Sequence, residues 1–445
     1  MDLMVDSESI TVGKAAIGNL LGGIGYFYGQ SKIALPRIPD LKEQVDILSY
    51  WPAELYTAVP SRPGFPRGFL WDEGFHQLLI WRWDIHISLD IIGHWLDLMN
   101  IDGWIPREQI LGAEALSRVP EEYVPQHPTN GNPPTLLLAL SDIVSGLKDN
   151  KFTAMDRNDI SLFLNHAFVR LEAWFQWFNT TQSGSLTSSY YWHGRDNKTI
   201  RLLNPRVDQN FNLFFQLLIS TLSSGLDDYP RASHPSNDER HLDIRCWMFL
   251  AADCMHSIED LLNKETKPDK NYGSTAKLLS DLDLLNQIHF DDAYGAYFDF
   301  GNHTEKVELK WREVDVGHNN TTCELVRVVL EKPELRFVPH IGYVSLNHGF
   351  WKSSLNSSRI AASFGLTMDY VLLPKQENGP YQDTAKALYT ELRSNLIRNI
   401  VRNYEDTGFL WEQFDQDEGK GKGTHPFTGW TSLVVLIMAE AYGKI

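Results

Sequence analysis

The densest group of chemically reactive side chains lies between Ser224 and Trp247, where five carboxylates occur within twenty-four residues. Asp227 and Asp228 stand between a glycine and a proline, so the sequence predicts that both side chains lie on a turn rather than inside a helix. A turn holds carboxyl groups at fixed positions, from which they can give or take protons. This pattern indicates acid–base chemistry.

A second carboxylate pair, Glu239 and Asp243, leads into a run of apolar residues at helical spacing. The spacing predicts that both lie on one face of a helix, where like charges repel by about a few tenths of a kcal/mol unless a helix N-terminus, an arginine or a ligand compensates. Two interpretations remain open. The pair could form a solvated first turn stabilised by the helix dipole, or it could bind a ligand, which the acidic turn before it and the buried-looking Cys246 and Trp247 after it favour.

Glu412 has a different setting, because aromatic residues flank it in the segment Phe409 to Phe414, which follows a predicted long helix. Aromatic surroundings favour the protonated form of a carboxyl group by desolvation, and they can form a wall for a sugar. The motifs HExxH, CxxC, GxSxG and the Walker sequence are absent from the chain. Carboxylate chemistry is therefore the leading option, and no metal or cofactor is expected.

Polar and aromatic residues also gather where other predicted loops meet helices. Trp71 and Asp72 begin a predicted helix after a proline-rich approach, and Arg107 lies in a later loop. We expect these three residues to line the same site as the carboxylates, without a separate role for each.

The composition narrows the class of partner. The 445-residue chain has a formal net charge of -17, which disfavours nucleic acid or an anionic membrane and leaves neutral ligands open. Aromatic residues make up 12% of the chain, and many stand beside polar residues and prolines, as suits stacking against sugars. Three cysteines do not make a disulfide framework.

Sequons indicate a lumenal protein, although chance occurrence is the alternative. They comprise Asn179, Asn197, Asn302, Asn319, Asn320 and Asn356. Met1 to Ser9 is acidic and is not followed by the apolar core of a signal peptide, and no run reaches about 18 uninterrupted apolar residues. We therefore expect any membrane attachment to come from a segment outside this chain.

The periodicity predicts one domain over residues 1–445, built from ten or more helices arranged in a ring with the functional loops at one end. Short strands are expected as decorations. The predicted helices include Ala15–Gln30, Trp71–Trp81, Ile85–Asn100, Pro133–Leu147, Arg157–Phe178, Val207–Ser223, His241–Asn263, Tyr272–Ile288, Arg359–Val371, Tyr381–Tyr404 and Trp430–Tyr442, and the strands Asp292–Phe300, Val307–Trp311 and Arg336–Val344.

Four motifs, PSRPGFPRGFLWDEGFHQL, SGLDDYPR, ERHLDIRCW and TGFLWEQFD, closely resemble glycoside hydrolase family 63, and the resemblance runs across nearly the whole chain. It implies an all-α fold, the (α/α)6 toroid. It also implies an inverting exo-α-glucosidase that removes the terminal α-1,2-linked glucose from Glc3Man9GlcNAc2, the N-linked oligosaccharide of nascent glycoproteins, in the endoplasmic reticulum lumen. The cytoplasmic tail, membrane anchor and N-terminal β-rich domain typical of eukaryotic members are not present in this sequence.

The resemblance also implies roles for individual residues. The general acid falls on Asp227, the general base falls on Glu412, and Glu239 and Asp243 fall in the family's substrate-binding signature. Inversion requires the two catalytic carboxyl groups to lie about 6.5 to 9.5 Å apart. Two other functions stay open: a glycan-binding remnant without turnover, and a trehalase-like or short-oligosaccharide hydrolase on the same scaffold.

Overall fold

The computed structural model describes ten stretches of the chain. Asp227 lies outside them, as do the predicted helix Arg359–Val371 and nearly all of Val207–Ser223. The described stretches are 6–35, 47–194, 222–225, 231–264, 271–304, 306–315, 321–329, 331–344, 382–415 and 418–439.

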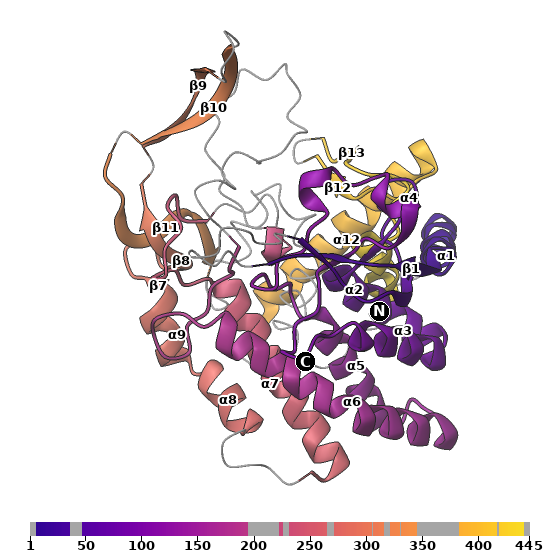
Figure 1. The fold of residues 1–445 in the computed structure, drawn as a ribbon. Coiled ribbons are helices and arrows are strands. Elements are labelled where there is room, and N and C mark those ends of the chain that lie inside the picture. Colours follow the sequence, from indigo (N-terminus) through magenta and orange to yellow (C-terminus); the bar gives the residue numbers. More distant parts are fainter. Residues whose placement is uncertain are drawn as a thin grey trace.

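Helices form most of the regular structure in these stretches (Figure 1). The α-helices are α1 (Ser7–Gly22), α2 (Leu70–Trp83), α3 (Ile85–Asp97), α4 (Gly112–Leu116), α5 (Thr135–Lys148), α6 (Ala154–Thr181), α7 (Leu242–Leu262), α8 (Tyr272–Leu279), α9 (Leu282–His289), α12 (Gln382–Thr407) and α13 (Val434–Ala439). Short 3₁₀ turns are η1 (Glu121–Tyr123), η3 (Leu222–Ser224) and η5 (Trp430–Leu433).

Several helices begin where the sequence supplies a side-chain cap. The Asp84 carboxylate accepts the backbone N–H groups of His86 and Ile87 at the start of α3. Thr153 and Asp156 form a capping box at the start of α6. These caps satisfy N–H groups that have no partner inside the helix, so they fix where each helix starts.

The main hydrophobic core lies between packed helices. α5 packs against α2 on one side and against α7 on the other, while α3 and α6 contact each other and pack against α2 and α7 respectively. The core includes the fully buried indoles of Trp95, Trp104 and Trp174. Burying such large aromatic surfaces is the principal favourable term that holds these helices together.

The strands form small antiparallel sheets beside the helices. β1 (Ile24–Gly29) pairs with β4 (Ala53–Ala58), and β8 (Ala296–His303) lies between β7 (Phe290–Asp291) and β11 (Glu334–Val344). Figure 1 shows β7, β8 and β11 on the same side of the molecule as the hairpin of β9 and β10. The remaining pairs are β2 (Lys32–Ala34) with β3 (Ile47–Ser49), β5 (Gly68–Phe69) with β6 (Glu108–Gln109), β9 (Val307–Asp315) with β10 (Thr321–Val329), and β12 (Gln413–Phe414) with β13 (Gly421–Lys422).

The structure corrects two predicted helices. α1 ends at Gly22, and the second half of the predicted helix is strand β1, where Phe27 is buried between the exposed Tyr26 and Tyr28. The predicted helix at Tyr272–Ile288 is two helices, because Asp281 accepts the N–H of Leu284 and starts a new helix there. Strand β10 was not predicted.

Segments near the two ends of the chain pack together. α1 contacts α12 and α13, and η5 contacts α2. Thr428 joins the preceding loop to residues near β4, because its N–H donates to the carbonyl of Pro60 at 2.6 Å and its hydroxyl donates to the carbonyl of Val59 at 2.8 Å. Every helix in the described stretches is too short or too polar to cross a membrane.

Candidate active site

Glu412 is half-buried and fixed by its neighbours at the start of the β12–β13 hairpin. Its carboxylate Oε2 accepts the N–H of Thr424 at 2.7 Å, and its own N–H donates to the carbonyl of Thr424 at 3.0 Å. The indole N–H of Trp430 donates to the carbonyl of Glu412 at 3.0 Å. Trp411, the residue before Glu412, stacks on His425 with 3.9 Å between ring centroids. Glu412 thus lies on a non-helical segment, as expected, and Trp430 binds its backbone, whereas an aromatic wall for a sugar beside it stays a prediction.

Trp71 lies next to Trp430. It stands in the first turn of α2, and its ring centroid is 5.6 Å from that of Trp430. The N–H of Trp71 donates to the side-chain oxygen of Asn132 at 3.0 Å, and its carbonyl accepts from the Thr135 hydroxyl at 2.6 Å. Asp72 follows in the same turn and is buried, with 4% of its surface exposed. We call the adjacent rings of Trp71 and Trp430 the aromatic wall, and Trp430 links it to the backbone of Glu412.

The segment before Asp227 packs against this wall. Gly225 has a φ of +72°, and a Cβ placed on it would lie 2.7 Å from the Trp71 ring. The carbonyl of Ser223 accepts from the Asn132 side chain at 3.2 Å, so the same asparagine binds both segments. Asp227 itself lies outside the described residues, so its separation from Glu412 stays a prediction, but Gly225 two positions earlier lies against Trp71.

Arg107 joins this region through its backbone and its side chain. Its carbonyl accepts the N–H of Leu70 at 2.9 Å, which attaches it to the residue before Trp71. Its guanidinium contacts the Glu108 carboxylate at 2.6 Å and is partly exposed. The structure therefore places Trp71 and Asp72 in the first turn of α2 and links the Arg107 backbone to Leu70, while Trp430, the neighbour of Trp71, binds the backbone of Glu412.

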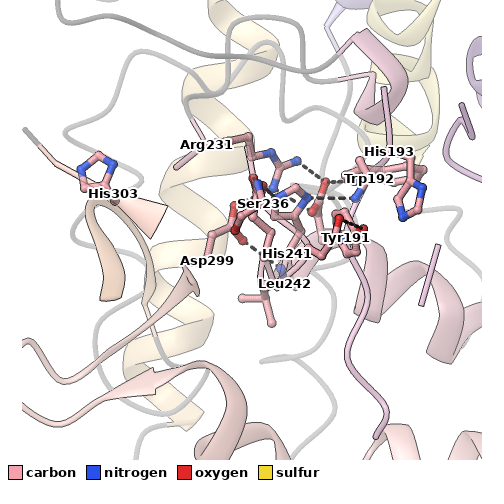
Figure 2. A network of polar contacts seen from close by, with 12 residues as sticks. Tyr191, Trp192, His193, Arg231, Ser236, His241, Leu242, Asp299 and His303 are labelled. Carbon is pink, nitrogen blue, oxygen red and sulfur yellow. Dashed lines mark hydrogen bonds and ion pairs between the residues drawn. The ribbon is translucent and has the colours of Figure 1, made fainter. Parts of the chain in front are cut away.

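Asp243 belongs to a buried polar network rather than to an open surface (Figure 2). Arg231 contacts both oxygens of Asp243, at 3.0 and 2.6 Å, and also contacts Asp299 at 2.6 Å. The Trp192 indole N–H donates to Asp243 at 2.8 Å. Burial acts to raise the pKa of Asp243, but the charge and hydrogen bonds of Arg231 outweigh it, so the pKa is lowered.

Glu239 is also buried and bound by protein groups. Its carboxylate accepts from His241 Nε2 at 2.7 Å and from the N–H of Ser236 at 3.0 Å. His241 Nδ1 accepts the N–H of Trp192, which leaves the ring proton on the nitrogen that faces Glu239. Figure 2 shows Trp192, Ser236 and His241 close to one another.

The prediction that Glu239 and Asp243 share one helix face is wrong. α7 begins at Leu242, whose N–H donates to Asp299 at 2.9 Å, and Arg240 pairs with strand residue Phe300. These two contacts hold the chain extended before the helix, so Glu239 precedes it. Binding of a sugar by this pair stays a prediction.

Several residues of the site were missed by sequence reasoning. Asn132 and Trp430 position the aromatic wall, and Arg231 and Asp299 neutralise one another's charge beside Asp243. Arg231 could have been suspected, because it stands in the same acidic stretch as the carboxylates. Asp299 gave no such signal, since it comes from a strand distant in the sequence.

Two of the predicted sequons fall on described residues. Asn179 lies in α6, where its side-chain oxygen accepts from the Tyr190 hydroxyl at 2.9 Å. Asn302 lies in β8 and is half-buried. The others, Asn197, Asn319, Asn320 and Asn356, lie outside the described residues.

Comparisons with known proteins agree with the predicted family. The model of the glycosyl hydrolase family 63 C-terminal domain matches residues 2–359 and 348–440. Mannosyl-oligosaccharide glucosidase GCS1 of Arabidopsis thaliana is 55% identical over 98% of this chain. Alpha-glucosidase 2 of the same plant is 54% identical over 98% of it. This chain spans 55% and 60% of the length of these two relatives.

A solved structure supports the fold. It is a family 63 mannosylglycerate hydrolase from Thermus thermophilus in complex with Tris and D-glycerate, with a TM-score of 0.52 at 13% identity over 86% of this chain and 96% of that chain. The shared architecture is helical with small sheets. On the match to the family model and the identity to the plant relatives, the chain belongs to glycosyl hydrolase family 63 and matches the C-terminal domain of that family.

Proposed function

We propose that this chain, as one catalytic domain over residues 1–445, is an inverting exo-α-glucosidase that removes the terminal α-1,2-linked glucose from Glc3Man9GlcNAc2. The observation that carries the proposal is the placement of Glu412, a fixed carboxylate beside the aromatic wall of Trp71 and Trp430. A sugar ring that stacks on such a wall would lie within reach of the carboxylate.

Glu412 is suited to the role of general base. Oε2 is held by the N–H of Thr424, whereas Oε1 has no hydrogen-bond partner among the described residues. The free oxygen can accept a proton from water, and the bound one keeps the carboxylate in a single orientation. In this mechanism Asp227 protonates the leaving oxygen while the activated water attacks the opposite face of the glucose, so β-glucose is released.

The proposal includes the (α/α)6 toroid. The side-by-side packing of α2, α5 and α7, with α3 and α6 against α2 and α7, supports two layers of helices. Trp71 stands at the N-terminal end of α2 and Asp243 at the N-terminal end of α7, which supports a site built at one end of the helices.

The names of the relatives support the choice of substrate. Proteins called mannosyl-oligosaccharide glucosidase include the Arabidopsis relative and one from Saccharomyces cerevisiae that is 30% identical over 95% of this chain. We propose accordingly that the partner is the N-linked oligosaccharide of nascent glycoproteins in the endoplasmic reticulum lumen. Contact with the membrane would come only through a segment outside this chain.

The test is turnover of Glc3Man9GlcNAc2 beside trehalose, followed by NMR before the released glucose equilibrates. We expect β-glucose first from the glycan and none from trehalose. Asp227→Asn and Glu412→Gln should each lower kcat by about 10²- to 10⁴-fold. Glu418→Gln is the matched control, because Glu418 is exposed and pairs only weakly with Lys420 at the surface.

Other outcomes would select a different function. Release of α-glucose first would overturn inversion and require carboxyl groups about 5 to 5.5 Å apart. Glycan binding without turnover would indicate a remnant, and cleavage of trehalose would indicate a trehalase-like hydrolase.

A further inference from the structure

A single buried carboxylate, that of Glu108, holds two arginines at the edge of the site. Its Oε2 accepts from Arg67 Nε at 2.8 Å, and its Oε1 contacts Arg107 Nη2 at 2.6 Å. The Glu108 and Arg67 side chains are 7% and 9% exposed, whereas that of Arg107 is 20% exposed. The pair of Glu108 and Arg67 is therefore interior, and Arg107 alone of the three extends toward solvent.

The Glu108 carboxylate is ionised because of these arginines. Burial acts to raise its pKa, but the charges of Arg107 and Arg67 and the hydrogen bond from Arg67 outweigh it, so the pKa of Glu108 is lowered. Two positive charges thus share one negative charge in a poorly solvated place. An unneutralised charge here would be costly, so the geometry of both arginines depends on Glu108.

Rigid packing fixes the inner half of this arrangement. The Arg67 guanidinium lies over the Phe69 ring at 4.6 Å and over the Phe65 ring at 5.7 Å. The N–H of Glu108 donates to Gln126 Oε1 at 3.2 Å, and Glu108 pairs with Phe69 in the β5–β6 ladder. These contacts fix the Glu108 carboxylate, so its position determines where the Arg107 guanidinium that contacts it lies.

We propose that Glu108 is a positioning residue, which aims the Arg107 guanidinium at the hydroxyl groups of a sugar that stacks on Trp71. The carbonyl of Arg107 accepts the N–H of Leu70, the residue before Trp71, so the backbone of Arg107 is attached to the start of the helix that carries Trp71. Arg107 keeps N–H groups beyond those that contact Glu108, and these are the donors that would bind the sugar. This inference rests on the proposed function, because it deepens the role of Arg107 in the same site.

The experiment compares Glu108→Gln with Glu114→Gln in the full chain. Glu114 also contacts an arginine through both oxygens, but that pair with Arg62 is exposed, at 54% and 56%. Both variants remove one carboxylate charge that contacts an arginine, but Glu108 is buried and shared by Arg67 and Arg107, whereas Glu114 is exposed and contacts Arg62. We expect Glu108→Gln to lower kcat/KM on Glc3Man9GlcNAc2 by about 10- to 100-fold, chiefly by raising KM, as loss of one charged hydrogen bond would. Glu114→Gln should leave kcat/KM unchanged.

A double-variant cycle tests whether Glu108 acts through Arg107. Arg107→Gln should lower kcat/KM by itself, and adding Glu108→Gln should lower it little further. Additive losses in the double variant would overturn the positioning role. So would a wild-type KM in Glu108→Gln if Arg107→Gln has lost activity. Both outcomes would leave the proposed function intact. Full activity of Arg107→Gln would also overturn it. The proposed function is tested separately by Glu412→Gln.

A double variant tests the proposal in case Glu108→Gln does not fold. If Glu108→Gln does not fold, Arg67→Met with Glu108→Gln removes the buried cation together with the carboxylate. This double variant should fold, as judged by circular dichroism and a cooperative thermal transition, and should still show the raised KM. A wild-type KM in the folded double variant would refute the proposal.

Discussion

Trp71 and Trp430 lie 5.6 Å apart between ring centroids although they stand near opposite ends of the chain, and the Trp430 N–H also binds the carbonyl of Glu412. Trp430→Phe should keep the ring contacts and lose only this hydrogen bond. A typical protein hydrogen bond contributes about 0.5 to 1.5 kcal/mol, so we expect kcat to fall about 2- to 10-fold as Glu412 loses one support.

Steady-state kinetics of Trp430→Phe beside Trp83→Phe would measure this effect. Trp83 is 66% exposed, so its substitution should change neither kcat nor the thermal midpoint. An unchanged kcat in Trp430→Phe would mean that the hydrogen bond to Glu412 does not matter for turnover.

Gly225→Ala should damage the site more than its backbone angle alone explains. Gly225 and Gly408 have nearly equal φ values, +72° and +75°, but a Cβ on Gly225 would meet the Trp71 ring at 2.7 Å, whereas a Cβ on Gly408 would meet nothing within 4 Å. Both substitutions strain the backbone, and only Gly225→Ala displaces the ring. We expect a lower thermal midpoint and a lower kcat/KM than in Gly408→Ala. Equal effects in both variants would exclude the steric contact.

Asp243→Asn should destabilise the protein, because it removes one of the two carboxylates that neutralise buried Arg231. Asp299 still pairs with Arg231 in this variant, so the expected cost is that of weakened charged hydrogen bonds, about 1.5 to 3 kcal/mol, and urea unfolding would measure it. Asp97→Asn is the control, since the Asp97 pair with Arg170 is exposed and should contribute about 0 to 1 kcal/mol. Unchanged stability with a raised KM would instead support the prediction that Asp243 binds sugar.

His289 should make the protein sensitive to acid. The ring is fully buried, and burial lowers its pKa from 6.5 to about 3, so it is neutral in the folded protein. The unfolded chain binds this proton below about pH 6.5, so the free energy of unfolding falls as the pH drops from about 6.5 toward 3, by up to about 1.4 kcal/mol per pH unit.

Urea unfolding at a series of pH values would check this effect. His289→Gln should flatten the pH dependence between about pH 5 and 6.5, while His256→Gln, at a half-exposed position, should keep the wild-type slope. The same slope in both variants would contradict the assignment.

Elements with local signals were predictable from the sequence. α3 and α5 carry helical periodicity, and α6 has its capping box in the sequence itself, so all three were predicted near their observed positions. β1 was missed because the glycines around Gly23 were interpreted as helix packing, although alternation of Tyr26, Phe27 and Tyr28 indicates a strand.

The site was predictable only in part, because several of its residues come from elements that are distant in the sequence. Glu412 was predicted on a non-helical segment from the residues next to it, and the structure has it there. Asn132 and Asp299 reach the site from distant elements, and a pairing between distant elements leaves no periodic pattern in either segment. The spacing of apolar residues predicted a helix that includes Glu239. The pairing of Arg240 with Phe300 keeps this segment extended, and α7 begins only at Leu242. Helical spacing cannot reveal such a pairing.

The bonds from Thr428 to Val59 and Pro60 can form only late in the synthesis of the chain. Thr428 follows Val59 by 369 residues, and at about 5 to 20 residues per second the ribosome needs roughly 20 to 70 s to make that interval. During this time the carbonyls near β4 and one face of Trp71 lack their later partners. The early part of the domain must therefore stay soluble with this surface open, so the nascent chain would depend on chaperones for longer than contacts between neighbouring helices would require.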